Sequence, residues 1–286
     1  MRVSARKKRA DFTAGHEATV VYPHQLFQEN PALAVDRPVI LAEDPWFFKR
    51  FRFHAQKLVL HRASMRRYRD HLAARGFRVE YIEAADLDTS TDLIVQLARK
   101  GISEIHLCDP LETGLIEEIE KACSMQGVKL VTYESPMFLC SRDYLAEFYK
   151  GGRRFYLTEF YIAQRKRLGI LLEQDGKPGG KRWTFDTLNR ESLPKDFPIP
   201  PVWHPAENEY VPEAISYVKD HFPNACGNVT PFFWPVTFED ANRWFEDFLV
   251  NRLSFFGRYE DAIHRNEPVL FHSALSPLLN IGLLTP

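Results

Sequence analysis

The sequence predicts an α/β fold with a doubly wound parallel sheet, followed by a region built from helices. Up to about residue 135, short β-branched apolar runs alternate with longer helical segments, which is typical of parallel strands joined by helical crossovers. Beyond that point the strand patterns disappear and helical patterns continue. We therefore expect an α/β domain over residues 18–135, and a linker with helices over residues 136–286.

Five short runs enriched in β-branched and apolar residues are predicted to be strands. They cover residues 18–22, 38–42, 78–82, 104–108 and 128–132. Helices are predicted between them over residues 53–75, 91–100 and 113–126. Gly76 and Gly127 follow the first and third of these helices, at positions where helices commonly end. The second region is predicted to hold a proline-rich loop over 193–205 and helices over 144–149, 157–168, 211–221, 238–253 and 256–264.

The helix predicted over residues 53–75 carries both apolar and basic positions. Leu58, Met65 and Leu72 recur every seven residues and predict a stripe that faces the core. The other faces of this helix hold His54, His61, Arg62, Arg66 and Arg69. The simplest interpretation is that these basic side chains are solvated.

Composition and charge limit the kinds of protein that this chain can be. The 286 residues are 45% hydrophobic, and 37 basic residues nearly balance 38 acidic ones. A nucleic-acid surface would therefore have to come from local clusters of basic residues. No apolar run reaches the length of a membrane span and no signal-peptide pattern opens the chain, so we expect a cytoplasmic protein. The four cysteines match no zinc or iron–sulfur spacing, and no metal ligand is predicted.

Several enzyme motifs do not occur in the sequence. No G-x-G-x-x-G follows the first predicted strand, and the glycine-rich residues 176–181 are followed by Arg182 instead of a magnesium-binding Ser or Thr. No catalytic residue is predicted. Polar residues do follow the predicted strands: His24, Glu43, Asp44 and Asp109. Parallel sheets bind ligands at this edge, but polar residues also end strands for ordinary turn reasons.

Near the C-terminus, Ser276 and Pro277 form a typical helix start, with a serine N-cap and a proline at the first helical position. Free backbone N–H groups at such a start can bind a phosphate. The residues that follow are largely apolar. We expect this segment to expose an apolar face, as an element whose packing partners are missing.

The most specific segment of the chain is residues 53–65, Phe-His-Ala-Gln-Lys-Leu-Val-Leu-His-Arg-Ala-Ser-Met. Further segments are residues 22–27, 43–45, 135–139, 160–165, 179–181, 185–186, 189–190, 256–262 and 272–284. In order and spacing these segments resemble the photolyase and cryptochrome family, in its bacterial iron–sulfur branch of photolyase-related proteins. The resemblance covers residues 18–286.

The resemblance implies an α/β domain that can hold a ribityllumazine antenna and a helical domain that binds FAD and a four-iron cluster. In that family, light-excited reduced flavin passes an electron to a pyrimidine dimer in DNA, the dimer splits, and the electron returns; some relatives sense light instead. The family residues that contact the phosphate side of FAD correspond in this chain to Tyr259, Ser273, Leu275 and Ser276. Antenna contacts fall on Gln25 and Glu43, but Pro23 stiffens the turn before Gln25 where many relatives have glycine.

The family's remaining flavin, lesion and cluster residues would follow residue 286, and none of the four cysteines matches a cluster ligand. The resemblance therefore implies a DNA photolyase, a carbon–carbon lyase, that is incomplete. We expect this chain alone to bind FAD weakly or not at all, to show no repair, and to need a second polypeptide. The alternatives are a standalone chromophore-binding light sensor and an inactive fragment. The lesion, cyclobutane or (6-4), stays open.

Contact with DNA is expected from basic residues of the second region. These are Arg142, Lys150, Arg153, Arg154, Arg165, Lys166 and Arg167. Neutralising phosphates needs only local positive charge, although such residues are also common on ordinary helix surfaces.

Overall fold

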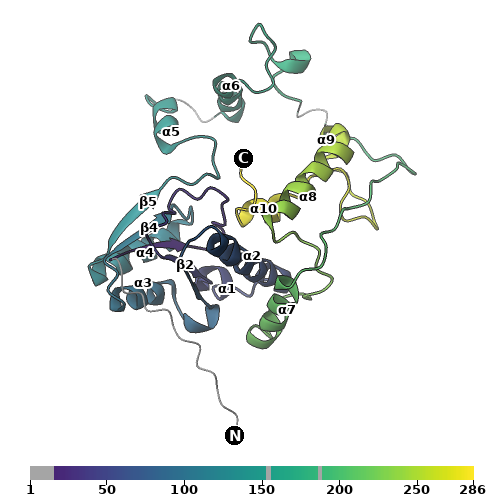
Figure 1. Ribbon diagram of the computed structural model, residues 1–286. Helices are drawn as coiled ribbons and strands as arrows, with labels where there is room; N and C mark the ends of the chain where they lie inside the picture. Colours follow the sequence, from purple (N-terminus) through teal and green to yellow (C-terminus); the bar gives the residue numbers. More distant parts are fainter. Residues whose placement is uncertain (1–15, 153–155, 186–188) are drawn as a thin grey trace. The chain divides into compact units, whose positions relative to one another are not determined.

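The computed structural model describes residues 16–152, 156–185 and 189–286 (Figure 1). Its sheet has five parallel strands in the order β3-β2-β1-β4-β5. The strands are β1 (Glu17–Val21), β2 (Val39–Ala42), β3 (Val79–Ile82), β4 (Glu104–Cys108) and β5 (Lys129–Tyr133). The strand order reverses between β1 and β4, which makes the sheet doubly wound. Sheets of this kind commonly bind ligands beyond the carboxyl ends of the strands at the point of reversal. The predicted α/β class is confirmed.

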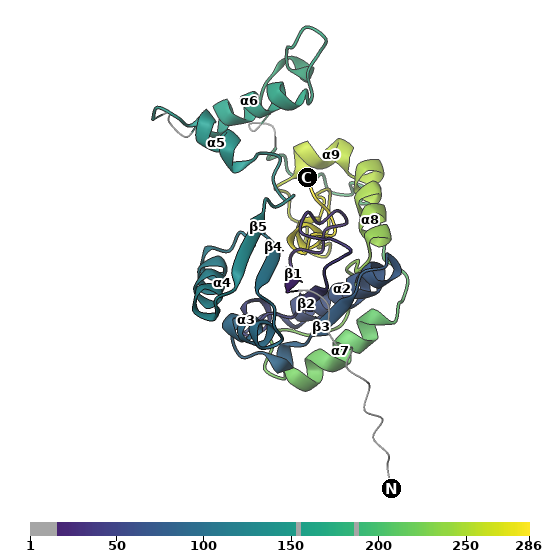
Figure 2. The same cartoon turned by 60° about the vertical axis from the view of Figure 1, so that its left-hand side comes forward.

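Three long helices follow the strands: α2 (Ala55–Ala74), α3 (Ser90–Arg99) and α4 (Thr113–Gln126). α3 and α4 pack against each other, and α2 lies on the opposite face of the sheet (Figure 2). Gly127 ends α4 in the left-handed conformation that glycine favours. The sequence did not predict the short helix α1 (Pro45–Phe48), which Asp44 caps by accepting a hydrogen bond from the Trp46 N–H. A 3-10 turn, η1 (Ala84–Asp86), follows β3.

The remaining elements are α5 (Arg142–Phe148), α6 (Leu157–Leu168), η2 (Gly179–Lys181), α7 (Tyr210–His221), α8 (Phe238–Asn251), α9 (Leu253–Tyr259) and α10 (Ser276–Asn280). The chain forms two compact units. The first unit comprises the residues up to Met137, Pro205–Ala241 and Pro277–Pro286. The second unit comprises Phe138–His204 and Asn242–Ser276. The domain division at residue 135 stays a prediction.

The predicted core stripe of α2 is confirmed, since Leu58, Met65 and Leu72 are buried. The interpretation of its basic face as solvated is wrong for His61 and Arg62, which are 3% and 2% exposed. Helix α7 packs on α2 within the first unit and covers this face. The sequence could not show this cover, because α7 lies about 150 residues further along the chain.

The C-terminal segment is packed, so the expectation of an exposed apolar face is wrong. Leu278, Ile281 and Leu283 are buried within the first unit. The Leu26 N–H donates to the Ile281 carbonyl over 3.1 Å. A Cβ on Gly282, where φ is +83°, would lie 2.7 Å from the ring of Phe27. The loop after β1 therefore supplies the packing partners.

Among residues 16–152, 156–185 and 189–286, no helix combines the length and apolarity needed to cross a membrane.

Candidate functional site

The carboxyl edge of the sheet holds the residues that follow β1, β2 and β4. Gln25 is fully buried after β1. Its Nε2 donates to the Cys108 carbonyl over 2.8 Å, and its Oε1 accepts from the Tyr22 N–H at 3.4 Å. Both polar atoms of the amide are thus engaged in joining the ends of β1 and β4. This geometry gives Gln25 a role in shaping the edge.

Glu43 is also fully buried, directly after β2. Its Oε1 pairs with Arg62 Nη1 at 2.8 Å and accepts from the Tyr81 hydroxyl at 2.6 Å. Its Oε2 accepts from the Ala84 N–H at 2.9 Å. Burial raises the pKa of Glu43, while Arg62 and these hydrogen bonds lower it. Arg62 also binds Glu213 at 2.6 Å and stacks on the ring of Tyr217, so Glu43 lies at the centre of the contact between α2 and α7.

Beside these two residues lie four buried polar atoms that make no hydrogen bond among the described residues. They are the Tyr22 hydroxyl, His24 Nδ1, Asp44 Oδ2 and His61 Nδ1, which we call the carboxyl-edge cluster. The ring of Phe47 contacts both histidines, with its centroid 4.5 Å from that of His24 and 5.9 Å from that of His61. An unsatisfied buried polar atom costs about 1–3 kcal/mol, so such a group is suited to meet a polar ligand.

Burial fixes the protonation of the carboxyl-edge cluster. It lowers the pKa of His24 to about 4 and that of His61 to about 3, so both imidazoles are neutral at pH 7. His24 Nε2 lies 2.8 Å from the Pro110 carbonyl and must donate to it, which leaves Nδ1 as a free acceptor. Burial raises the pKa of Asp44 to about 6. At pH 7 the cluster therefore offers two neutral imidazole acceptors, the largely ionised carboxylate of Asp44, and the Tyr22 hydroxyl as a donor.

The four residues predicted for the FAD phosphate side lie in the second unit. Tyr259 is buried in an aromatic cluster, with its ring centroid 5.3 Å from that of Phe197 and 5.7 Å from that of Phe271. Phe271 lies two residues before Ser273, so its contact with Tyr259 places the predicted positions Tyr259 and Ser273 near each other. The Ser273 carbonyl accepts from the Trp244 indole over 3.2 Å.

Ser276 begins α10 and is exposed, whereas Ser273 and Leu275 are partly buried. Ala274 between them has a φ of +50°, a left-handed conformation that turns the chain between the two serines. The predicted helix start at 276 is present, but α10 has only five residues. The assignment of all four residues to a flavin site stays a prediction.

The predicted DNA-contacting residues differ in what they contact. Arg165 is 5% exposed, and its guanidinium donates to the carbonyls of Ile170, Leu171 and Trp183. Arg167 donates to the Leu139 carbonyl over 2.6 Å. Arg165 thus stabilises the turn after α6. A DNA-binding surface at this place would have to come from the basic residues next to it. Arg153 and Arg154 lie outside the described residues.

Sequence reasoning missed two members of the carboxyl-edge cluster, Tyr22 and His61. A signal for His61 was present, since it lies three residues after Leu58 and therefore on the same side of α2 as the apolar stripe. Tyr22 directly follows β1, as ligand-binding residues of parallel sheets do.

Comparisons with known proteins agree with this architecture. The model of a family described as deoxyribodipyrimidine photo-lyase-related protein matches residues 19–234. The chain is 29% identical over 237 residues to a (6-4) photolyase of Agrobacterium fabrum, which covers 81% of this chain and 46% of that protein. It thus spans about half the length of this photolyase.

Two uncharacterised proteins of Acanthamoeba polyphaga mimivirus are also similar to the chain. The first is 31% identical over 189 residues, which is 61% of this chain and 94% of that protein. The second is 64% identical over 28 residues, which is 10% of this chain and 22% of that protein.

Proposed function

The chain belongs to the deoxyribodipyrimidine photo-lyase-related protein family, and from this we propose that it is a photolyase-like flavoprotein acting on pyrimidine dimers in DNA. The observation that carries the proposal is the similarity to a (6-4) photolyase along 81% of the chain. When bound, a reduced flavin would supply the light-driven electron that splits the dimer.

In this proposal, Ser273 and Ser276 offer hydroxyls to the diphosphate of FAD, and Leu275 and Tyr259 pack beside it. The positive φ at Ala274 supports this role, because the turn exposes a serine at its far end. None of these contacts needs a charged side chain.

A flavin titration of the full chain tests the proposal. The quenching of FAD fluorescence is measured for the wild type and for Ser273→Asp and Ser276→Asp. A carboxylate placed against the diphosphate repels it, so each variant is expected to weaken FAD binding at least tenfold. Light-dependent loss of dimers from ultraviolet-irradiated DNA, with a dark control, then tests repair.

The matched control is Ser254→Asp. Ser254 is an exposed serine in the first turn of α9, in the same unit, where an aspartate is compatible with the helix dipole. Ser254→Asp should leave the affinity for FAD within twofold of that of the wild type. Equal affinity for FAD in Ser276→Asp and the wild type would contradict the proposed phosphate site.

A second candidate, a chromophore-binding light-sensing module, is favoured by the carboxyl-edge cluster. Four buried polar atoms without a hydrogen-bond partner among the described residues, at the carboxyl edge of a doubly wound sheet, suit a small polar chromophore such as a ribityllumazine. Gln25 and Glu43 would shape the site, because their side-chain atoms are engaged elsewhere. Tyr22→Phe removes one free hydroxyl and should weaken lumazine binding about threefold to tenfold, measured from near-ultraviolet absorption after desalting. Desalted wild type without lumazine absorption would exclude this candidate.

A further inference from the structure

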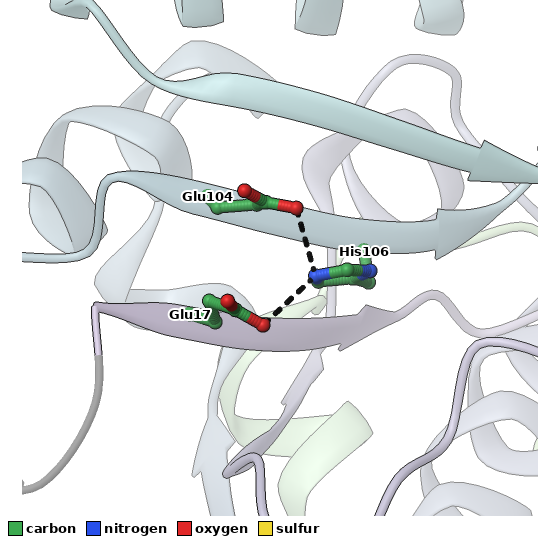
Figure 3. Close-up of side chains that lie close together, drawn as sticks. All are labelled: Glu17, Glu104 and His106. Atoms are coloured by element: carbon green, nitrogen blue, oxygen red, sulfur yellow. Dashed lines mark ion pairs between the residues drawn. The ribbon is translucent and has the colours of Figure 1, made fainter.

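A second polar cluster lies at the opposite edge of the sheet, where the strands begin. Glu17 is the first residue of β1 and Glu104 the first residue of β4, and the two are register partners in the parallel pair. His106 lies two residues beyond Glu104 and therefore on the same face of β4. Figure 3 shows the three side chains side by side, with the imidazole directed between the two carboxylates.

The distances within this cluster suit a shared metal ion better than direct hydrogen bonds. His106 Nε2 is 3.3 Å from Glu17 Oε2 and 3.3 Å from Glu104 Oε1. A charge-assisted N–H···O bond would be about 2.7–2.9 Å. Two metal–ligand bonds of about 2.1 Å at a tetrahedral angle place their ligand atoms about 3.4 Å apart. The ligand atoms of all three residues lie within 4.8 Å of one another.

The His106 side chain is prepared for coordination. It is 7% exposed, and its buried Nε2 makes no hydrogen bond within the described part of the chain. Its Nδ1 lies 3.0 Å from the hydroxyl of Tyr133, the last residue of β5. With Nδ1–H donating to that hydroxyl, the lone pair of Nε2 points at the two carboxylates. Metal-binding histidines are oriented in this way by a hydrogen bond from their other nitrogen.

We propose that Glu17, Glu104 and His106 form a Zn²⁺ site that ties the start of β1 to the start of β4. One imidazole and two carboxylates are ligands that zinc accepts, with a water completing four-coordination. Mg²⁺ instead favours six oxygen ligands. The proposal is independent of any photolyase activity, because the site lies at the edge of the sheet away from the carboxyl-edge cluster.

Two basic side chains neutralise the carboxylates and compete with the ion. Lys129 Nζ lies 3.1 Å from both oxygens of Glu104, and Arg37 Nη1 lies 3.8 Å from Glu17 Oε2. Lys129 is 68% exposed, so it can move into solvent when the metal binds. This competition predicts that removing the lysine charge strengthens zinc binding.

The test titrates the metal-free full chain with ZnCl₂ in competition with a chromophoric zinc indicator. We expect a site for one ion per chain that His106→Gln weakens at least tenfold and that excess MgCl₂ does not fill. Tyr133→Phe keeps the ring but removes the hydroxyl, and should weaken binding about tenfold. The matched control is His16→Gln, an exposed histidine one residue before Glu17, which should change the affinity less than twofold.

Lys129→Gln distinguishes a metal site from damage to the fold, because it should bind zinc several times more tightly than the wild type. A misfolded variant cannot produce that gain. Unchanged zinc affinity in His106→Gln would overturn the proposal, as would unchanged or weaker affinity in Lys129→Gln. The three side chains would then form a polar cluster that holds no metal ion.

Discussion

At the scale of single residues, burial decides the charge state of the carboxyl-edge cluster. Asp44 is fully buried and uses only Oδ1, which accepts from Trp46 N–H at 2.9 Å and from Ser90 Oγ at 2.7 Å. Burial is the main cause that raises its pKa from 3.8 to about 6, and these two hydrogen bonds oppose it. Keeping Asp44 ionised at neutral pH therefore lowers the free energy of unfolding.

Asp44→Asn should remove that cost. Because the folded-state pKa is raised, the contribution of Asp44 to stability is present below pH 3.8 and is lost as the pH rises through 6. Asparagine keeps the Oδ1 acceptor and never ionises. The free energy of unfolding, variant minus wild type, should thus increase by about 2.5 kcal/mol between pH 4 and pH 7.5. Urea denaturation at both pH values measures it.

His24 and His61 titrate in both proteins, so their contributions cancel in that difference. The control is Asp36→Asn, an exposed aspartate whose substitution removes no buried charge. If Asp44→Asn showed no more pH dependence than this control, the carboxyl-edge cluster would be more solvated than its burial indicates.

At the scale of elements, the C-terminal segment depends on one glycine. Gly282 combines a φ of +83° with a close approach to the ring of Phe27 and to the backbone nitrogen of Leu26. Any side chain there meets both a strained backbone and a clash. The segment after α10 therefore packs on the loop after β1 only because residue 282 has no Cβ.

Gly282→Ala should destabilise the chain by about 2–4 kcal/mol, because backbone strain and overpacking add. Gly76→Ala is the matched control, since Gly76 has a φ of +88° but no atom of the described residues lies within 4 Å of an added Cβ. It should cost only the strain, about 1–2 kcal/mol. Thermal and urea unfolding of both variants measure the difference, and equal losses would contradict the close packing of residue 282.

At the scale of the whole molecule, the first unit is assembled from three separate segments of chain. Helix α7 covers Arg62 and supplies Glu213 and Tyr217 to it. The C-terminal segment covers Leu26 and Phe27. The sheet and its own helices thus form only part of this unit.

A fragment of residues 16–137 should therefore be at least about 3 kcal/mol less stable than the full chain, because several large apolar side chains and Arg62 lose their cover. Amide hydrogen exchange in β1 and β2 reports this loss with the same probe in both proteins. The fragment should exchange about a hundredfold faster. Equal protection would mean that the α/β region is stable by itself.

The local elements could be predicted from the sequence because their patterns are local. Residues 113–126, 157–168 and 104–108 form the predicted helices and strand at the predicted bounds. The helix predicted over residues 256–264 instead spans Leu253–Tyr259. The candidate residues that follow the strands, among them His24 and Asp44, were also visible, because parallel strands end at one edge.

The sequence by itself determined the α/β class, most element bounds and the family. Only the tertiary structure decided which charged residues are buried, which polar atoms lack partners, and that the apolar C-terminal segment packs on the loop after β1. These properties depend on contacts between residues far apart in the chain, such as Arg62 with Glu213 and Gly282 with Phe27. A local pattern records which face of an element is apolar, but it does not record what covers the other faces.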